Sequence, residues 1–355
     1  MTPTSEDSTA RAVQSVAHGD DAAPAGHDAQ AARASLSVLL ERLGLPILFA
    51  IMVVVFCLLR PDTFATSANF QTITITQSVL VVLALALMIP LIGGRFDVSV
   101  GSTLGFSSIL CAGMMSRHGW PLVAVVVLAI VVGVAIGLVN GVIVAYLGVN
   151  SLIATLGTAT VISGLVQAYS KGIPVSSGLS QTLTDLGSGT LLGIPDLFVL
   201  AVVLGVIVWF GITQTVYGRT LFAVGSNLSA ARLTGVRVKP VVLTSFVFSG
   251  VIAGVGGLLQ IASTGNGDPT VGGVNFIVPA VAAVFLGATT WQPGKYNVFG
   301  TFLGLFFVGS MVGGLTLVGA APWVTSVFNG AALVIAIAVS AQIRRHRTGS
   351  LEVGT

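Results

Sequence analysis

Charged residues are scarce in this 355-residue chain, where Asp, Glu, Lys and Arg make up 8% of the sequence. Soluble domains carry roughly 25%, and the apolar fraction here is 54%. A composition so poor in charge excludes a soluble globular protein and predicts a polytopic membrane protein. The net charge of +3 reflects basic residues in cytoplasmic loops and does not indicate nucleic acid as a partner.

Motifs for common chemistries are also missing. The only Gly-Lys pair, Gly294-Lys295, is followed by Tyr296 and does not belong to a phosphate-binding P-loop. Zinc-ligand spacing, a nucleophile elbow and clustered carboxylates are absent from the sequence, so we expect no catalytic residue, no metal site and no enzyme activity. Cys57 and Cys111 lie in apolar runs and are interpreted as packing residues, not as a disulfide framework.

The chain divides into two polar tails and a long apolar region. Residues 1–40 lack any apolar period and are predicted to be a disordered cytoplasmic tail, and residues 346–355 form a second cytoplasmic tail. Residues 41–345 are predicted to be an all-α transmembrane domain, because about ten segments are long and apolar enough to span a bilayer. They cover residues 43–60, 76–93, 99–116, 120–147, 151–170, 195–213, 240–262, 275–290, 297–318 and 322–342.

The distribution of basic residues predicts the orientation of these spans. With the N-terminus inside and the spans alternating, the outside segments hold only Arg60, Arg117 and Lys171. The inside segments hold the others, namely Arg11, Arg33, Arg42, Arg95, Arg219, Arg232, Arg237, Lys239, Lys295, Arg344, Arg345 and Arg347. This excess places both termini and the 214–239 loop in the cytoplasm, with 171–194 and 263–274 outside. The ten spans can be split as five and five, and an odd number in each half suggests an inverted repeat.

The run GGRFDVSVGS, Gly93 to Ser102, interrupts the apolar pattern. It places Asp97 near or within the bilayer, where an acid must face protein or water. Asp97 is interpreted either as the cap of the following helix or, with Ser99, as part of a pathway or gate. Arg95 is interpreted as an inside-facing anchor.

Other polar residues within or beside the spans are further candidates for the pathway or gate. They are Asn140, Asn150, Thr155, Gln167, Gln260 and Asn275. Their amides and hydroxyls suit a neutral polyhydroxylated solute, and equally suit hydrogen bonds between helices. Pro279 is expected to break the eighth span.

Glycine, with 44 residues, recurs at four-residue spacing and forms smooth helix faces that let neighbouring helices approach closely. The packing candidates are Gly133, Gly137 and Gly141, with the pairs Gly250–Gly254, Gly300–Gly304 and Gly309–Gly313. For these glycines, close packing is the interpretation we adopt.

The loop YGRTLFAVGSNLSAARLTGVRVK, Tyr217 to Lys239, carries basic residues and no acid. It predicts a short helix that begins near Ser226 or Asn227 and ends before Gly235. We expect Ser226 to Gly235 to dock on a soluble partner. Ala230 and Ala231 offer a small face, Leu228 and Leu233 apolar anchors, and Arg219 and Arg232 charges for acids on the partner. The alternative is a simple positive anchor for the flanking spans.

Four ordered motifs resemble the permease subunits of bacterial ABC importers for ribose and other simple sugars. FDVSVGS is similar to the family's IDLSVGS, and SLIATLGT to its PFIATLGT. The Tyr217–Val238 loop resembles the family's YGR…G…N…AA-R loop, and FLGATTWQPGKYNVFGTFLG its glycine-rich segment. The sequence departs from the family at Arg95, where glycine is usual, at Leu228, where Glu is frequent, and at Asn150-Ser151, where a proline pair is common. GRFDVSVG, together with Pro279 and Gly294-Lys295, resembles the motifs of a subgroup that includes transporters of sugar alcohols.

The resemblance, which covers residues 40–345, implies a ten-span fold of the type II importer kind in the bacterial inner membrane. It implies an ABC ATPase subunit that binds ATP and magnesium, so that this chain holds no cofactor itself. It also implies an extracytoplasmic sugar-binding protein and a second permease copy or paralogue as partners, with membrane lipid around the spans.

The main alternative from the residues is an ion-coupled secondary transporter, since an inverted repeat and an intramembrane acid are found in that class. Asp97 is the one plausible coupling carboxylate within a span, and the basic loop would then have no explanation. A channel would need a ring-like polar filter, which the sequence does not show.

Overall fold

The computed structural model describes residues 43–348, except for the side chains of 274–275 and 344–348. Contacts divide the chain into Met1–Glu41 and Arg42–Thr355, so all that follows concerns the second unit. The predicted tail at 1–40 and most of the predicted tail at 346–355 lie outside the described residues.

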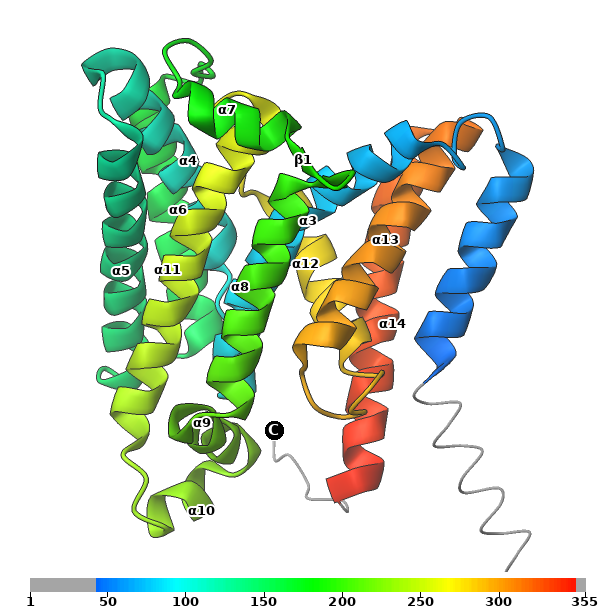
Figure 1. Cartoon of the computed structure of the whole chain (residues 1–355). Helices are drawn as coiled ribbons and strands as arrows, with labels where there is room; N and C mark the ends of the chain where they lie inside the picture. Colours follow the sequence, from blue (N-terminus) through cyan, green and yellow to red (C-terminus); the bar gives the residue numbers. More distant parts are fainter. Residues whose placement is uncertain (1–42, 349–355) are drawn as a thin grey trace, which may run out of the picture. The chain divides into compact units, whose positions relative to one another are not determined.

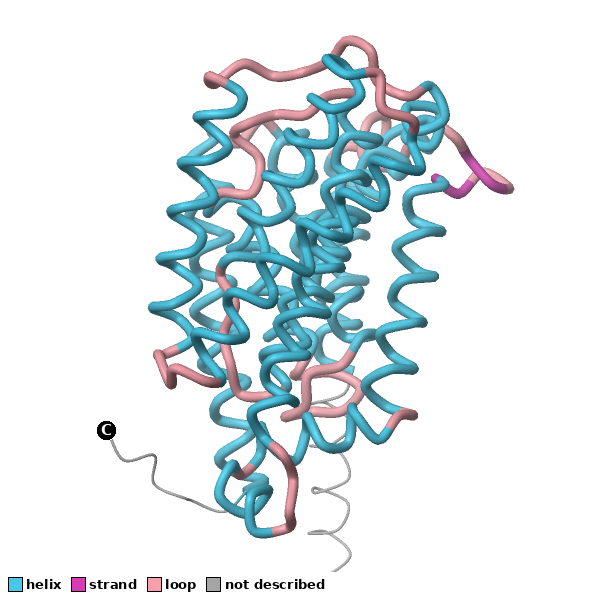
Figure 2. The backbone as a smooth tube through the Cα atoms, turned by 90° about the vertical axis from the view of Figure 1, so that its left-hand side faces the viewer, coloured by secondary structure: helices cyan, strands magenta, loops and turns pink. Residues whose placement is uncertain are grey.

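Described residues form helices and one small hairpin (Figures 1 and 2). The helices are Leu43–Leu59, α3 (Ser67–Ile92), α4 (Ser99–His118), α5 (Leu122–Ala145), α6 (Ser151–Ser170), α7 (Gln181–Ser188), α8 (Asp196–Thr213), α9 (Val216–Ser226), α10 (Leu228–Leu233), α11 (Val238–Thr264), α12 (Val274–Gly287), α13 (Val298–Val318) and α14 (Pro322–Thr348). The strands β1 (Thr190–Leu191) and β2 (Ile194–Pro195) pair antiparallel.

A helix coincides with each predicted span, and the prediction of an all-α polytopic membrane protein is confirmed. Among the described residues, 7 helices are long and apolar enough to cross a bilayer, while Leu43–Leu59 and α12 are shorter. Helix α4 is long enough but is not among the seven, because its many Ser and Gly residues lower its mean hydropathy. The count of ten spans and the five-and-five repeat therefore stay predictions.

Helix α12 corrects one expectation, because it continues through Pro279 instead of breaking there. Residues 280–285, which follow the proline, are buried. In membrane helices a proline is tolerated where neighbouring helices and local adjustments compensate for the lost backbone hydrogen bond. Contacts with α3, α13 and α14 surround α12 in this way.

Helix α3 is the most deeply buried of the long helices and crosses the others obliquely (Figure 1). In its most apolar stretch 83% of the residues are buried, against 11% in α14. Its segment from Val81 to Met88 has no exposed surface. An apolar surface on all sides is the pattern of a helix enclosed by protein, whereas the exposed apolar side chains of α14 suit a lipid environment.

Glycines set the distance between α5 and α11. An added Cβ at Gly137 would lie 2.5 Å from the carbonyl oxygen of Phe246, and Gly133 and Gly250 would each clash with the other's backbone. Gly141 faces Leu243 in the same interface. Helix α11 is thus held along its length against α5, backbone to backbone.

The same arrangement recurs between α12 and α13, where Gly300 meets Gly287 and Gly304 meets Ala283. In α11, Gly254 lies against Ala129. Gly309 contacts the side chain of Gln77. The predicted packing glycines in α5, α11 and α13 that are named above therefore lie in close contact with neighbouring helices.

The loops gather mainly at the two ends of the long helices (Figure 2). Segment 171–194, expected to be a loop, contains α7 and part of the β1–β2 hairpin. Its Val175 N–H donates to Gly267 O at 2.9 Å and the Gly267 N–H donates to Val175 O at 2.8 Å. The two segments predicted to be external are therefore joined at one end of the helices, opposite α9 and α10 (Figure 1).

Candidate functional site

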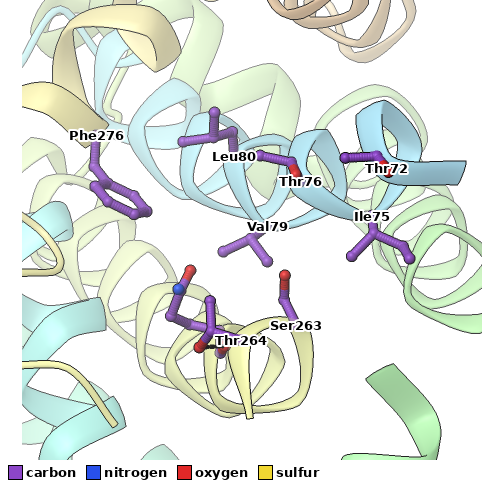
Figure 3. A pocket seen from close by; sticks show the side chains of 9 residues that line it. Thr72, Ile75, Thr76, Val79, Leu80, Ser263, Thr264 and Phe276 are labelled. Carbon is purple, nitrogen blue, oxygen red and sulfur yellow. Dashed lines mark hydrogen bonds between the residues drawn. The ribbon is translucent and has the colours of Figure 1, made fainter. Parts of the chain in front are cut away.

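A cavity of about 440 Å³ opens between α3, α11 and α12 (Figure 3). We call it the α3–α11 cavity. It is lined by Thr72, Ile75, Thr76, Val79 and Leu80 of α3, by Gln260, Ser263 and Thr264 of α11, and by Phe276 of α12. Its volume lies within the range of small-molecule sites. It lies at the end of α11 that adjoins the Gly267 bridge.

Polar groups in this cavity are free to bind a solute. Gln260 is only 4% exposed, yet among the described residues its side-chain amide makes no hydrogen bond, and neither do the hydroxyls of Thr76 and Ser263. The Thr72 and Thr264 hydroxyls donate instead to backbone carbonyls one helical turn earlier.

The ring of Phe276 and the aliphatic side chains of α3 form the apolar part of the wall (Figure 3). A few convergent polar groups in a mainly apolar cavity are the usual features of a small-molecule site. An uncharged lining that combines an amide, hydroxyls and an aromatic ring suits a neutral polyhydroxylated compound.

Asp97 does not line this cavity, because its carboxylate is buried in a hydrogen-bonded network. Its Oδ1 accepts from the N–H of Ser99 at 3.0 Å and from the Ser99 hydroxyl at 2.6 Å. Its Oδ2 accepts from the Ser249 hydroxyl at 3.3 Å. The Asp97–Ser99 backbone contact is the bond that a capping residue makes, although α4 as assigned begins at Ser99.

Asn140 extends this network across two more helices. Its Nδ2 donates to the Ser99 hydroxyl at 2.7 Å, and its Oδ1 accepts from the Thr158 hydroxyl at 2.7 Å. Asn140 is fully buried. The structure therefore brings Asp97, Ser99 and Asn140 together as a connection between α4, α5, α6 and α11, where each polar group has a protein partner.

The segment between α3 and α4 is also fixed to the start of α6. The N–H of Phe96 donates to the Ser151 hydroxyl at 3.0 Å, and the N–H of Val98 donates to Thr155 Oγ1 at 3.1 Å. Asn150 caps α6, since its Oδ1 accepts from the N–H of Leu152 at 2.9 Å. The structure thus places Thr155 and Asn150 in backbone-supporting contacts.

The remaining pathway candidates lie apart from one another. Gln167 is exposed on α6 and does not line the α3–α11 cavity. Asn275 is the second residue of α12, next to cavity residue Phe276, but its side chain lies outside the described part of the chain. Gln260 alone of the polar candidates lines the cavity.

The 214–239 loop folds into two short helices, α9 and α10, and the expected helix before Gly235 is present. Asn227 caps α10 through a hydrogen bond from the Ala230 N–H to its Oδ1 at 2.9 Å. Gly235 follows α10 with a φ of 81°, which favours glycine at a helix end. Leu233, at the end of α10, is 90% exposed.

The exposed part of these helices also includes Arg219, Ser226, Ala230 and Arg232, while Leu228 is partly buried. The expectation that Ala231 belongs to the docking face is wrong, because its side chain is buried. It is only 3% exposed and packs with the buried side chains Val144, Val224, Val238, Val242 and Phe246. In this arrangement its methyl group attaches α10 to the helix bundle and is not available to a partner.

Sequence reasoning did not identify Thr72, Thr76, Ser263, Thr264 and Phe276 as cavity residues. One signal was present, because Thr72 and Thr76 are four residues apart and therefore share a helix face. Ser263 and Thr264 had been assigned to an external loop, whereas α11 extends through Thr264. Their convergence depends on the crossing of α3 and α11.

Comparisons with known proteins match nearly the whole described region. The family model for the branched-chain amino acid transport system / permease component matches residues 69–337. The D-allose transport system permease of Escherichia coli K12 is 28% identical over 305 residues, which are 86% of this chain and 93% of that protein. No solved structure matches the chain.

Two further relatives are similar to this chain over most of its length. The ribose import permease of Haemophilus influenzae is 30% identical over 295 residues, which are 82% of this chain and 90% of the relative. The autoinducer 2 import system permease of Photorhabdus temperata is 30% identical over 273 residues, which are 75% of this chain and 80% of the relative.

Proposed function

Since the chain belongs to the ribose- and monosaccharide-type permeases of ABC importers, we propose that it carries a simple sugar or polyol through the α3–α11 cavity. As a member of that family it is a multi-pass inner-membrane protein, and its relatives are transport subunits and not enzymes. The substrate class proposed is a pentose, hexose or polyol.

The observation that carries this proposal is the unpaired amide of Gln260 inside the cavity. Its nitrogen and oxygen are not among the fully buried polar atoms that lack a partner, so the amide is open to the cavity, where a solute hydroxyl can take the place of water. The hydroxyls of Thr76 and Ser263 and the ring of Phe276 complete an uncharged surface for such a solute. Among the described cavity residues there is no charge that would select an ion or an amino acid.

Importers of this class work with an ATPase and a solute-binding protein. We propose that the ATPase docks on α9, α10 and the residues beside them, through the exposed Arg219, Ser226, Asn227, Ala230, Arg232, Leu233 and Gly235 and the partly buried Leu228. We also propose that the binding protein docks at the opposite end, on α7 and the segment around Gly267, and that a second permease copy or paralogue completes the transporter. ATP and magnesium belong to the ATPase in this scheme.

Helix α11 connects the two ends of this scheme. It follows α10 after a short turn, and its last turns carry Gln260, Ser263 and Thr264. Its 27 residues extend about 40 Å. Close contacts of Gly133 and Gly137 on α5 with the α11 backbone make the pair a stiff unit. A displacement of α10 by the ATPase would therefore reach the cavity as a tilt of α5 and α11 together.

The test uses the complete importer, with its ATPase and binding protein, and uptake of labelled ribose, D-allose and polyols. For a transported compound, Gln260→Leu should lower uptake by about 2- to 10-fold, the effect of losing one hydrogen bond of about 0.5–1.5 kcal/mol. Gln167→Leu is the matched control, because Gln167 is an amide outside the cavity. Uptake of none of these compounds, or full uptake in both Gln260→Leu and Phe276→Ala, would contradict the proposal.

A further inference from the structure

A second cavity, of about 400 Å³, lies at the opposite end of α11 from the α3–α11 cavity. Three basic side chains from three separate segments line it: Arg95 from the α3–α4 segment, Arg232 from α10 and Lys239 from the first turn of α11. Tyr146 and Asn150, at the ends of the α5–α6 turn, also line it. We call it the basic cavity.

The charges of the basic cavity have no counter-ion in the described part of the chain. No acidic residue lines the cavity, and no ion pair forms between its bases and any described carboxylate. Asp97 is the acid nearest to Arg95 in sequence, but its oxygens accept hydrogen bonds from Ser99 and Ser249. Like charges gathered around one cavity repel one another, and an anion placed among them removes that repulsion.

Arg95 provides a second, independent observation. Its side chain is half-buried, and its Nε is fully buried without a hydrogen-bond partner. A buried guanidinium nitrogen that lacks an acceptor is unfavourable. Arg95 also lines the basic cavity, where an oxygen-rich anion could accept hydrogen bonds from the accessible N–H groups of the same guanidinium and neutralise its charge.

The donors present suit a phosphate group. Guanidinium groups bind phosphate through two parallel hydrogen bonds, and lysine contributes a compact point charge. The ammonium of Lys239 lies 5.5 Å from the centre of the Tyr146 ring, a cation–π contact that holds the side chain at the cavity. Asn150 uses its Oδ1 to cap α6, which leaves its amide N–H₂ as a further donor.

We propose that the basic cavity binds a phosphate-bearing anion, either a soluble phosphate compound or the headgroup of an acidic phospholipid. Such an anion bridges Arg232 on α10 and Arg95 in the segment that leads to the Asp97 network. It therefore stabilises the present position of α10 relative to the helix bundle. The expected consequence, which rests on the proposed function, is slower transport when the anion is bound, because coupling requires α10 to move.

Binding is measured on the purified chain, without ATPase or sugar. In phosphatidylcholine nanodiscs, sodium pyrophosphate is titrated while the thermal unfolding midpoint and the binding isotherm are followed, with sodium chloride at matched ionic strength as reference. In a second arm, phosphatidylglycerol is mixed into the nanodiscs and no pyrophosphate is added. Stabilisation by pyrophosphate assigns a soluble ligand, and stabilisation by phosphatidylglycerol alone assigns the lipid headgroup.

The variants Arg95→Gln and Lys239→Gln should each weaken the effective probe by about 10-fold or more, since each removes a charge-assisted hydrogen bond. Arg237→Gln is the matched control, because Arg237 is an exposed base two residues from Lys239 that does not line the cavity. Because Arg95 and Lys239 lie in different segments, one of the two variants can still test binding if the other does not fold.

The proposal is overturned if neither probe stabilises the chain more than sodium chloride does, or if Arg237→Gln reduces the effect as much as Lys239→Gln. Transport by the complete importer provides the regulatory readout, in which the effective probe should slow uptake in the parent and in Arg237→Gln but not in Lys239→Gln. Unchanged uptake despite binding would refute the regulatory part. If the chain binds the probe but no sugar or polyol is transported, the proposed function fails while the anion site stands.

Discussion

The close contact between α5 and α11 predicts opposite effects for one substitution at two glycines. An added Cβ at Gly137 would lie 2.5 Å from Phe246 O and 2.7 Å from the Cα of Val247. Both distances are well inside ordinary van der Waals contact. Gly157, on the exposed side of α6, has nothing within 4 Å of the same added atom. The two sites therefore differ in packing while both lie inside long helices.

The magnitudes follow from two competing terms. Replacing glycine by alanine inside a helix is worth about 1 kcal/mol in helix propensity, whereas overpacking a tight interface costs about 1–3 kcal/mol. Gly157→Ala should thus stabilise the chain by up to about 1 kcal/mol. Gly137→Ala should come out between neutral and destabilised by about 2 kcal/mol, and Gly137→Leu should impair folding or assembly.

The assay is thermal unfolding of the detergent-purified variants, followed by size-exclusion chromatography and by uptake with the complete importer. The unfolding midpoint should fall in the order Gly157→Ala, parent, Gly137→Ala, Gly137→Leu. Equal midpoints for the two alanine variants, or normal expression and uptake for Gly137→Leu, would refute the reasoning and place this face of α5 against lipid.

Three further predictions concern the network and the coupling helices. Asp97→Leu should abolish uptake, because it leaves Ser99 and Ser249 without their acceptor at about 1–3 kcal/mol for each buried group. Asp97→Asn, which keeps an acceptor for the cap, should retain much of it. Equal loss in both, with uptake that collapses on adding an uncoupler while ATP stays high, would favour proton coupling. Leu233→Asp should leave folding intact but reduce co-purification of the ATPase, since this side chain is exposed, whereas Ala231→Trp should lower the unfolding midpoint by overpacking the cluster that holds α10. Undiminished co-purification with Leu233→Asp would contradict docking there. After replacement of both native cysteines, Ser226→Cys should resist a membrane-impermeant thiol reagent in intact cells and react in inverted vesicles; labelling in intact cells would invert the topology.

Several features could be predicted from the sequence because they depend on local composition and spacing. Runs of apolar residues fixed the positions of the long helices, since the length of a span is set by bilayer thickness. Asn227 and Gly235 predicted the bounds of α10, because capping uses side chains next to the helix itself. The prediction that Pro279 breaks its span was wrong, because neighbouring helices compensate for the lost backbone hydrogen bond. Those neighbours are set by the tertiary structure and cannot be deduced from the local sequence.

The candidate site was predictable only in part. Gln260 could be selected as a polar residue in an apolar run, but nothing in its neighbourhood distinguished it from Gln167, which is exposed on α6. Asp97 could be recognised as an acid next to the start of α4, while its contact with Ser249 joins residues 152 positions apart. Ala231 was assigned to the wrong surface because the side of α10 that faces the bundle depends on where α5 and α11 lie.

The sequence by itself determined the membrane class, the long helices, the basic character of the α9–α10 loop and the family. Each of these follows from hydropathy, charge and motifs that are read along the chain. Only the tertiary structure decided which polar groups are satisfied by protein and which remain free. It buried the amide of Asn140 between Ser99 and Thr158, because α4 and α6 pack beside α5 there. It left the amide of Gln260 open to a cavity, because α3 and α11 bring no polar partner to it.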